Sequence, residues 1–224
     1  DPVIFLEYAV DTAKVCREMN VNSVAVSAGY ICDEPRRVFY RHMDAVNIDL
    51  KAFTERFYRK LCSAHLDPVL DTLMYIHHET DVWLEITTLL IPDENDSSKE
   101  LDDMCRWIMD NLGPNVPLHF SAFHPDFKML DKARTPLSTL KRARTIALSH
   151  GLNYVYVGNV HDLEGDSTYC PNCHQRVIER DWYQLGEYQI TDGGLCADCG
   201  QSIAGKFSSQ QKRFGRKRVP IRIL

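Results

Sequence analysis

Apolar positions along the chain follow two alternating patterns, one typical of amphipathic helices and the other of buried strands. In residues 5–20 the apolar side chains recur at helical spacing, which predicts a helix. Residues 23–27 (Ser-Val-Ala-Val-Ser) form a short β-branched run before Gly29, which predicts a buried strand. The two patterns then alternate through the first 160 residues. Helices are expected at 5–20, 55–63, 68–79, 97–112 and 135–151, and a further helix is expected to begin at Glu34. Strands are expected at 23–27, 82–91, 116–123 and 154–157, and a further strand is expected to end at Asp49.

Residues that break or begin elements support these boundaries. Pro92 ends the strand at 82–91, and the spacing of Ser97 and Glu100 fits a capping box at the start of the next helix. Gly113 is followed by a proline and ends that helix, and Pro136 suits the first turn of the following one.

Strict alternation of helix and strand predicts βα units with right-handed crossovers and a parallel sheet. No G-x-G-x-x-G follows any of the strands, so a dinucleotide-binding fold has no support. A barrel or partial barrel is the expected architecture. Because only five strands follow an opening helix, and the chain starts at Asp1 without a methionine, we expect this sequence to be the C-terminal portion of a longer protein.

Composition places the chain among soluble globular proteins. Of its 224 residues, 44% are hydrophobic and 25% are charged, and the net charge is -5. A negative chain has no overall attraction for nucleic acid or anionic membranes, and no apolar run approaches the roughly 18 residues of a spanning helix. A membrane partner is therefore not expected, and a nucleic-acid partner is disfavoured.

The cysteines fall into two groups. Four are scattered through the first half and are interpreted as small apolar residues, whereas the other four form two C-x-x-C pairs. Each pair directs two thiolates at one point, so the two pairs predict a tetrahedral zinc site and a reducing, cytoplasmic compartment. A rubredoxin-like iron site is the main alternative. The C-x-x-C-H run ending at His174 also matches haem attachment, but the second pair would then have no purpose. The four predicted ligands are Cys170, Cys173, Cys196 and Cys199.

The chain is expected to divide into a partial barrel at 1–161, a zinc-ribbon-like domain at 168–205 and a basic tail at 206–224. The tail is interpreted as a solvated segment, because the whole chain is acidic.

Asp49 and Lys51 are the strongest candidate site residues of the first domain. Side chains two apart in a strand share a face, and parallel α/β folds bind ligands at the C-terminal ends of strands. The alternative is an ordinary surface ion pair.

Other residues at strand ends extend this candidate site. Ser27 and Gly29 close the first strand, where the glycine permits either close approach of a ligand or a simple turn. His124 follows a strand and precedes a proline. Together with Glu85, Asp49 and His124 lie on different strands that are expected to point into one site.

Spaced sequence blocks resemble the radical S-adenosylmethionine (radical SAM) enzymes, in particular the radical enzyme of the AmmeMemoRadiSam system, which is similar to pyruvate formate-lyase activating enzymes. The resemblance covers essentially the whole chain. The blocks are the opening run Asp-Pro-Val-Ile-Phe-Leu-Glu-Tyr-Ala-Val-Asp-Thr-Ala, then Val-Ser-Ala-Gly-Tyr from Val26, Asn-Ile-Asp-Leu-Lys from Asn47, Leu-Ile-Pro from Leu90 with Asn95-Asp96, and Leu-His-Phe-Ser-Ala-Phe-His-Pro from Leu118.

The resemblance implies a partial (β/α)6 TIM-like barrel that lacks its first strands. It also implies that the intact enzyme cleaves S-adenosylmethionine reductively at a [4Fe–4S] cluster. The resulting 5′-deoxyadenosyl radical would abstract hydrogen from a substrate that the resemblance does not name, a protein glycyl residue being one option. By the same resemblance, Asp49 and Lys51 contact the methionine part and line the site, and His124 lies near the adenosine. Ser27 and Gly29 would lie under the cofactor, and Asp1 would contact the methionine amino group.

Departures from the family pattern limit what this chain does alone. No C-x-x-x-C-x-x-C is present, so the chain is expected neither to bind the cluster nor to generate a radical, and no catalytic residue is assigned. Ala28 replaces a frequent asparagine and Asp93 a frequent glycine.

Two other functions remain open at this point. A lysine at a strand end can form a Schiff base, so Lys51 would serve an aldolase-like barrel. A non-enzymatic nucleic-acid-binding protein would use the zinc ribbon and the basic tail.

Overall fold

The computed structural model describes residues 1–207, and the chain divides into two compact units, Asp1–Val160 and His161–Leu224. The second unit is described as far as residue 207, so nearly all of the predicted tail at 206–224 lies outside the described residues. None of the helices within residues 1–207 has the length and apolarity needed to cross a bilayer.

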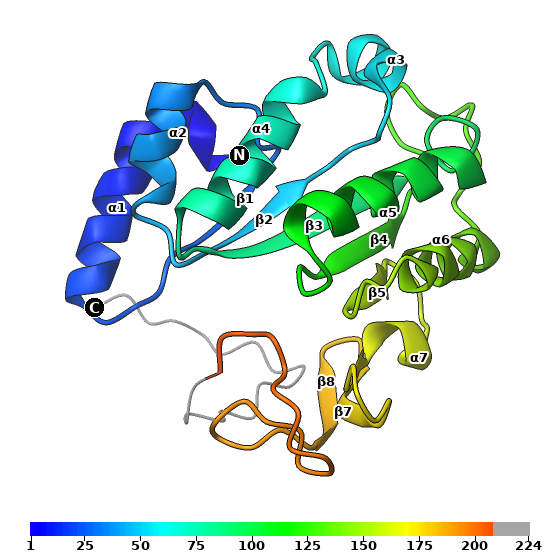
Figure 1. Cartoon of the computed structure of the whole chain (residues 1–224). Helices are drawn as coiled ribbons and strands as arrows, with labels where there is room; N and C mark the ends of the chain where they lie inside the picture. Colours follow the sequence, from blue (N-terminus) through cyan, green and yellow to red (C-terminus); the bar gives the residue numbers. More distant parts are fainter. Residues whose placement is uncertain (208–224) are drawn as a thin grey trace. The chain divides into compact units, whose positions relative to one another are not determined.

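The first unit contains a five-stranded parallel sheet whose successive strands are connected by helices (Figure 1). Its strands are neighbours in chain order, as in a β/α barrel, and β1 and β5 form the two edges. This confirms the predicted α/β class and parallel sheet. The strands are β1 (Val24–Ser27), β2 (Ala45–Asp49), β3 (Trp83–Leu90), β4 (Leu118–Ala122) and β5 (Val155–Gly158), and the helical elements are η1 (Pro2–Phe5), α1 (Leu6–Glu18), α2 (Asp33–Tyr40), α3 (Glu55–Phe57), η2 (Tyr58–Cys62), α4 (Asp67–Glu79), α5 (Ser98–Leu112) and α6 (Leu137–Ser149).

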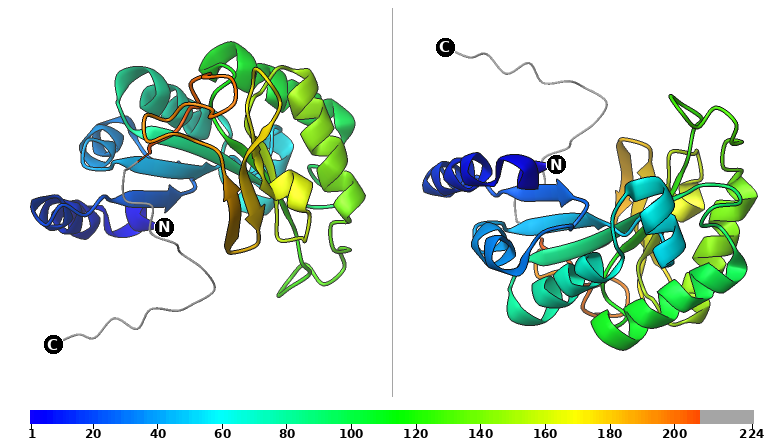
Figure 2. Two further views of the ribbon diagram at one scale, coloured as in Figure 1. Left: turned by 90° about the horizontal axis from the view of Figure 1, so that it is seen from below. Right: turned by 90° about the horizontal axis from the view of Figure 1, so that it is seen from above.

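The two faces of the sheet differ in burial. Alternate strand residues such as Ile48, Ile86 and Phe120 are fully buried under the helices, which cover one face of the sheet (Figure 2). The residues between them point to the opposite face and are exposed or half-buried. We call this second surface the polar face. Its polar residues are Asn47, Asp49, Glu85, Thr87, His119, Ser121 and Tyr156.

Two of the predicted helix features differ from the structure. The helix expected at 55–63 is a single α-turn, α3, followed by the π-helical turn η2, which ends at Ser63 in the left-handed conformation (φ 51°). The capping box at the start of α5 is only half formed. Ser97 Oγ accepts a hydrogen bond from Glu100 N at 3.2 Å, but the Glu100 carboxylate accepts from Phe53 N at 2.8 Å. A backbone donor in a neighbouring loop has therefore replaced the local partner.

The second unit is built around a three-stranded antiparallel sheet. It contains the short helix α7 (Leu163–Asp166) and the strands β6 (Thr168–Tyr169), β7 (Arg176–Asp181) and β8 (Gln184–Tyr188). The segments before β7 and after β8 carry the two C-x-x-C pairs, as expected for a zinc-ribbon-like domain.

Candidate functional site

The end of β2 carries the predicted acid and base. Lys51 Nζ lies 2.5 Å from Asp49 Oδ2, and the two side chains are 38% and 29% exposed. The pair is therefore formed, and it is accessible from solvent. Because Asp49 is on the polar face, this face ends in one anion and one cation at the C-terminal end of β2.

The Lys51 backbone is fixed by two side chains. Lys51 N donates to the Tyr58 hydroxyl at 3.1 Å, and Lys51 O accepts from Asn95 Nδ2 at 2.7 Å. Burial raises the pKa of Tyr58 well above its usual range, so this hydroxyl stays protonated. The pair with Asp49 thus rests on a backbone that neighbouring elements hold on both sides.

At the end of β1 the structure brings together three further predicted residues. Asp1 Oδ2 accepts hydrogen bonds from Ser27 Oγ at 3.2 Å and from Ala28 N at 2.9 Å, and Ser27 Oγ accepts from Gly29 N at 3.1 Å. Gly29 has φ +68°, and a Cβ there would lie 2.9 Å from Ile48 Cγ2. This position requires a glycine for the turn and for its contact with Ile48.

Of the three residues expected to point into one site, Asp49 and Glu85 lie on a common face of the sheet. Glu85 and Asp49 share the polar face, because Asn47 pairs in register with Glu85 and Asp49 with Thr87. His124 lies two residues beyond β4 and is exposed. The histidine bonded to Glu85 is His119, whose Nε2 lies 2.8 Å from Glu85 Oε2.

Sequence reasoning missed His119 as a site residue. The strand alternation that buries Phe120 and Ala122 directs His119 to the opposite face. Pairing of Thr87 with His119 then brings His119 close to Glu85. Alternation was readable from the sequence, but the register between β3 and β4 was not, because nothing local specifies which residues of two parallel strands lie side by side.

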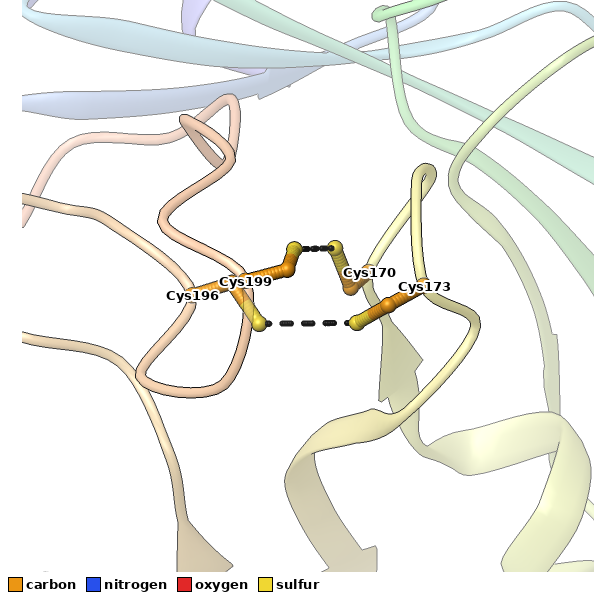
Figure 3. Close-up of side chains that lie close together, drawn as sticks. All are labelled: Cys170, Cys173, Cys196 and Cys199. Atoms are coloured by element: carbon orange, nitrogen blue, oxygen red, sulfur yellow. Dashed lines mark hydrogen bonds between the residues drawn. The ribbon is translucent and has the colours of Figure 1, made fainter.

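The four cysteines of the second unit form a compact cluster (Figure 3). Their Sγ atoms all lie within 4.8 Å of one another, with Cys170 to Cys199 at 3.6 Å and Cys173 to Cys196 at 3.8 Å. A tetrahedral ion with metal–sulfur bonds of about 2.3 Å places its sulfurs about 3.8 Å apart. This four-cysteine cluster therefore fits one four-coordinate metal ion. A four-iron cluster would need wider spacing, because each sulfur would bind a different iron.

The two knuckles have matching backbones. His174 N donates to Cys170 O at 3.0 Å, and Gly200 N donates to Cys196 O at 2.9 Å. Both residues have a left-handed backbone conformation, with φ 60° for His174 and 74° for Gly200. The histidine of the C-x-x-C-H run thus occupies the position that a glycine takes in the other knuckle, which argues against haem attachment.

The other cysteines do not fit a [4Fe–4S] cluster. They lie on α1, directly before α2, on η2 and on α5, and Cys105 is fully buried. Burial raises the pKa of the Cys105 thiol to about 12. Within the described residues, the only group of three or more candidate metal ligands is the four-cysteine cluster. The other cysteines are Cys16, Cys32, Cys62 and Cys105.

Comparison with known proteins gives one sequence relative and a shared fold, and no family model matches the chain. The uncharacterized protein MJ0808 of Methanocaldococcus jannaschii is 39% identical over 204 residues, which are 91% of this chain and 60% of that protein. The chain thus spans less than two thirds of the length of this relative.

Two solved structures are similar in fold. A domain of pyruvate-formate lyase-activating enzyme from Bacteroides vulgatus superposes with a TM-score of 0.62 and 16% identity, covering 71% of this chain and 94% of that one. A radical SAM methyltransferase from Sphaerobacter thermophilus superposes with a TM-score of 0.59 and 15% identity, covering 70% and 48%. The chain shares the fold of these two proteins.

Proposed function

We propose that the chain is the cofactor- and substrate-facing part of a radical SAM enzyme of the AmmeMemoRadiSam type, similar to the pyruvate formate-lyase activating enzymes. In this proposal the C-terminal edge of the parallel sheet binds S-adenosylmethionine. Cysteines outside this chain would hold the [4Fe–4S] cluster, since those of the described residues do not fit it. This chain would therefore bind and orient S-adenosylmethionine and the substrate, and no step of radical formation is assigned to its side chains.

The observation that carries the proposal is the Asp49–Lys51 pair at the end of β2 in this fold. One carboxylate and one ammonium group side by side complement the zwitterionic α-amino acid end of S-adenosylmethionine. Lys51 would bind the carboxylate of the methionine part and Asp49 its ammonium group. Ser27, Gly29 and Asp1 at the end of β1, together with His124 beyond β4, would line the remainder of the cofactor site.

Equilibrium binding of S-adenosylmethionine to the chain, measured by titration calorimetry, tests this proposal. Loss of a charged hydrogen bond costs about 1.5–3 kcal/mol, so Asp49→Asn and Lys51→Met should each weaken binding by about tenfold or more. The matched control is the surface pair of Asp11 and Lys14 on α1, 3.1 Å apart, where the same substitutions should leave binding unchanged. Equal binding by the wild type and the Asp49 and Lys51 variants would reject the assigned site.

The two alternative functions receive less support. A Schiff base needs a neutral Lys51 amine, whereas Lys51 Nζ lies against the Asp49 carboxylate as an ion pair. Residues 161–207 contain eight acidic and three basic residues, so the described part of the zinc-ribbon-like unit would repel a phosphate backbone. We propose zinc as the metal of the four-cysteine cluster, because four thiolates in a closed tetrahedral arrangement are typical of structural zinc sites.

A further inference from the structure

A hydrogen-bonded and stacked row of side chains crosses the polar face from β3 to β5. Trp83 Nε1 donates to Glu85 Oε1 at 2.9 Å, and Glu85 Oε2 lies 2.8 Å from His119 Nε2. The rings of His119 and Tyr156 stack with centroids 4.9 Å apart and an interplanar angle of 23°. Both oxygens of Glu85 are therefore engaged, and the imidazole is fixed at its edge and on its face.

This arrangement determines which nitrogen of His119 carries the hydrogen. A carboxylate only accepts hydrogen bonds, so the contact with Glu85 requires a hydrogen on Nε2. In the neutral imidazole the lone pair then lies on Nδ1, which becomes a hydrogen-bond acceptor. The His119 side chain is 29% exposed, so the ring is accessible to solvent.

The surroundings of His119 indicate the kind of group that Nδ1 would meet. None of the five strands of this sheet contains lysine or arginine. Their polar face carries the carboxylates of Asp49 and Glu85, and Lys51 just beyond β2 pairs with Asp49, so these three side chains together leave one negative charge. Beyond His119, Ser121 pairs in register with Gly158, and a Cβ on Gly158 would lie 3.2 Å from Ser121 Oγ. A glycine here leaves the end of β5 without a side chain on this face. The surface therefore favours an uncharged or cationic group with a hydroxyl or amino donor and disfavours phosphates and carboxylates.

We propose that His119, oriented by Glu85, is a substrate-binding residue of the polar face, whose Nδ1 accepts a hydrogen bond from a hydroxyl or amino group of an uncharged or cationic substrate. Glu85 acts as a positioning residue, and Tyr156 supports the ring. This inference rests on the proposed function only for the reaction that the bound substrate undergoes. The side-chain arrangement itself is a feature of this chain, whatever reaction it takes part in.

Nitrogen-15 NMR of the histidine side chains in the full chain, at about pH 8 where an ordinary imidazole is neutral, tests the orientation. We expect the His119 signals of a protonated Nε2 and a bare Nδ1. In Glu85→Gln, Trp83 Nε1 can only donate and so takes the amide oxygen, which leaves the amide NH₂ facing His119. The tautomer should then switch to a protonated Nδ1.

The second unit provides a matched control for this switch. His161 Nε2 lies 2.8 Å from Asp181 Oδ1, and the His161 ring stacks on Trp182. Asp181→Asn should therefore alter only the His161 signals. Backbone amide spectra establish that both variants are folded. A bare Nε2 in the wild type, or a folded Glu85→Gln variant with unchanged His119 signals, would overturn the assigned role of Glu85.

A matched set of small probes tests the ligand class. Tyramine is cationic with hydroxyl and ammonium donors, 4-hydroxyphenylacetate has the same ring and hydroxyl but is anionic, and trimethyl(2-phenylethyl)ammonium keeps the ring and the positive charge but has no hydrogen-bond donor. We expect tyramine to shift the His119 Nδ1 signal, and the other two compounds and the Glu85→Gln variant to show at most a small fraction of that shift. An absent tyramine shift, or equal shifts from tyramine and the acid, would overturn the proposal. Neither result depends on binding of S-adenosylmethionine, so failure here is distinct from failure of the proposed function.

Discussion

The side chain of Asn95 donates a hydrogen bond to the backbone carbonyl of Lys51, 44 residues earlier in the chain. Asn95 Nδ2 donates to Lys51 O at 2.7 Å and to Leu89 O at 2.9 Å, and Asn95 Oδ1 accepts from Ile91 N at 2.7 Å. Asn95 is only 2% exposed. One buried amide therefore links the segment after β2, which carries the candidate cofactor-binding lysine, to the segment after β3.

We predict that Asn95→Ala lowers the free energy of unfolding by about 2–4 kcal/mol, because it leaves buried backbone groups without partners. Asn95→Asp should also destabilise the protein, since a carboxylate cannot donate to two carbonyl oxygens. Urea unfolding measures both effects. The matched control is Asn153, whose Nδ2 donates to Asn115 Oδ1 in an exposed pair, where alanine should cost about 0.5 kcal/mol or less. A cost at Asn95 no larger than at Asn153 would show that the link contributes little.

Metal removal should unfold the four-cysteine unit and spare the parallel sheet. Without an ion, four thiols within 4.8 Å would stabilise one another only weakly, and small domains built on four metal-binding cysteines draw their folding free energy from the metal. A strong chelator, or the substitution Cys173→Ser, should therefore abolish the dispersed amide signals of residues 168–205. Those of β1 to β5 should remain.

The number of bound metal ions provides the control. Elemental analysis should find one ion per wild-type chain and far less in Cys173→Ser, whereas Cys32→Ser, an exposed cysteine before α2, should keep the full amount. A wild-type chain that folds fully without metal would contradict the prediction.

Two substitutions in the matching knuckles should have opposite effects on stability. Gly200→Ala places a side chain at φ 74°, where a Cβ meets no atom within 4 Å, so the cost is conformational and about 1 kcal/mol. His174→Gly relieves the same conformation in the other knuckle and should stabilise the metal-loaded unit by a similar amount, less the larger backbone entropy of glycine. Thermal unfolding of the metal-loaded chain measures both, and shifts of the same sign would refute the equivalence of the knuckles.

Much of the fold could be read from the sequence, because its elements are specified locally. The strand at β1 was marked by β-branched residues before Gly29, and β3 by its long apolar run before Pro92. The four-cysteine cluster was equally readable, because each C-x-x-C forms its own turn. The capping partner of Glu100 was not, because the sequence does not show that Phe53 N would lie near the start of α5.

The candidate site was only partly predictable for the same reason. Asp49 and Lys51 were recognised because they are two residues apart at one strand end. The bond of Glu85 to His119 joins residues 34 positions apart, and it depends on the register of two parallel strands. The contacts of Asn95 with Lys51 likewise depend on how two loops pack. Local patterns thus identified which residues are near strand ends, and tertiary packing decided which of them meet.

Glu55 lies in the segment after β2 and Glu100 bonds to that segment, and the two should give stability profiles of opposite sign with pH. Hydrogen bonds from Leu66 N, His65 and Arg59 lower the pKa of Glu55 to about 2 from the ordinary 4.5. Its stabilising contribution is therefore complete above about pH 4.5 and is lost as the pH falls towards 2. We expect Glu55→Gln to be less stable than the wild type at neutral pH, with a difference that shrinks over this acidic range.

For Glu100 the sign is reversed. Burial raises the pKa of this carboxyl above 4.5, and the hydrogen bond from Phe53 N offsets only part of that rise. The folded state thus resists deprotonation, so the Glu100 contribution is most favourable below pH 4.5 and is lost as the pH rises through the raised pKa. Glu100→Gln keeps an oxygen acceptor for Phe53 N without the charge, so its stability relative to the wild type should increase with pH over that window. Urea midpoints of the two variants and the wild type from about pH 3 to pH 7 measure both trends, and a falling relative stability of Glu100→Gln with pH would contradict the assigned effect of burial.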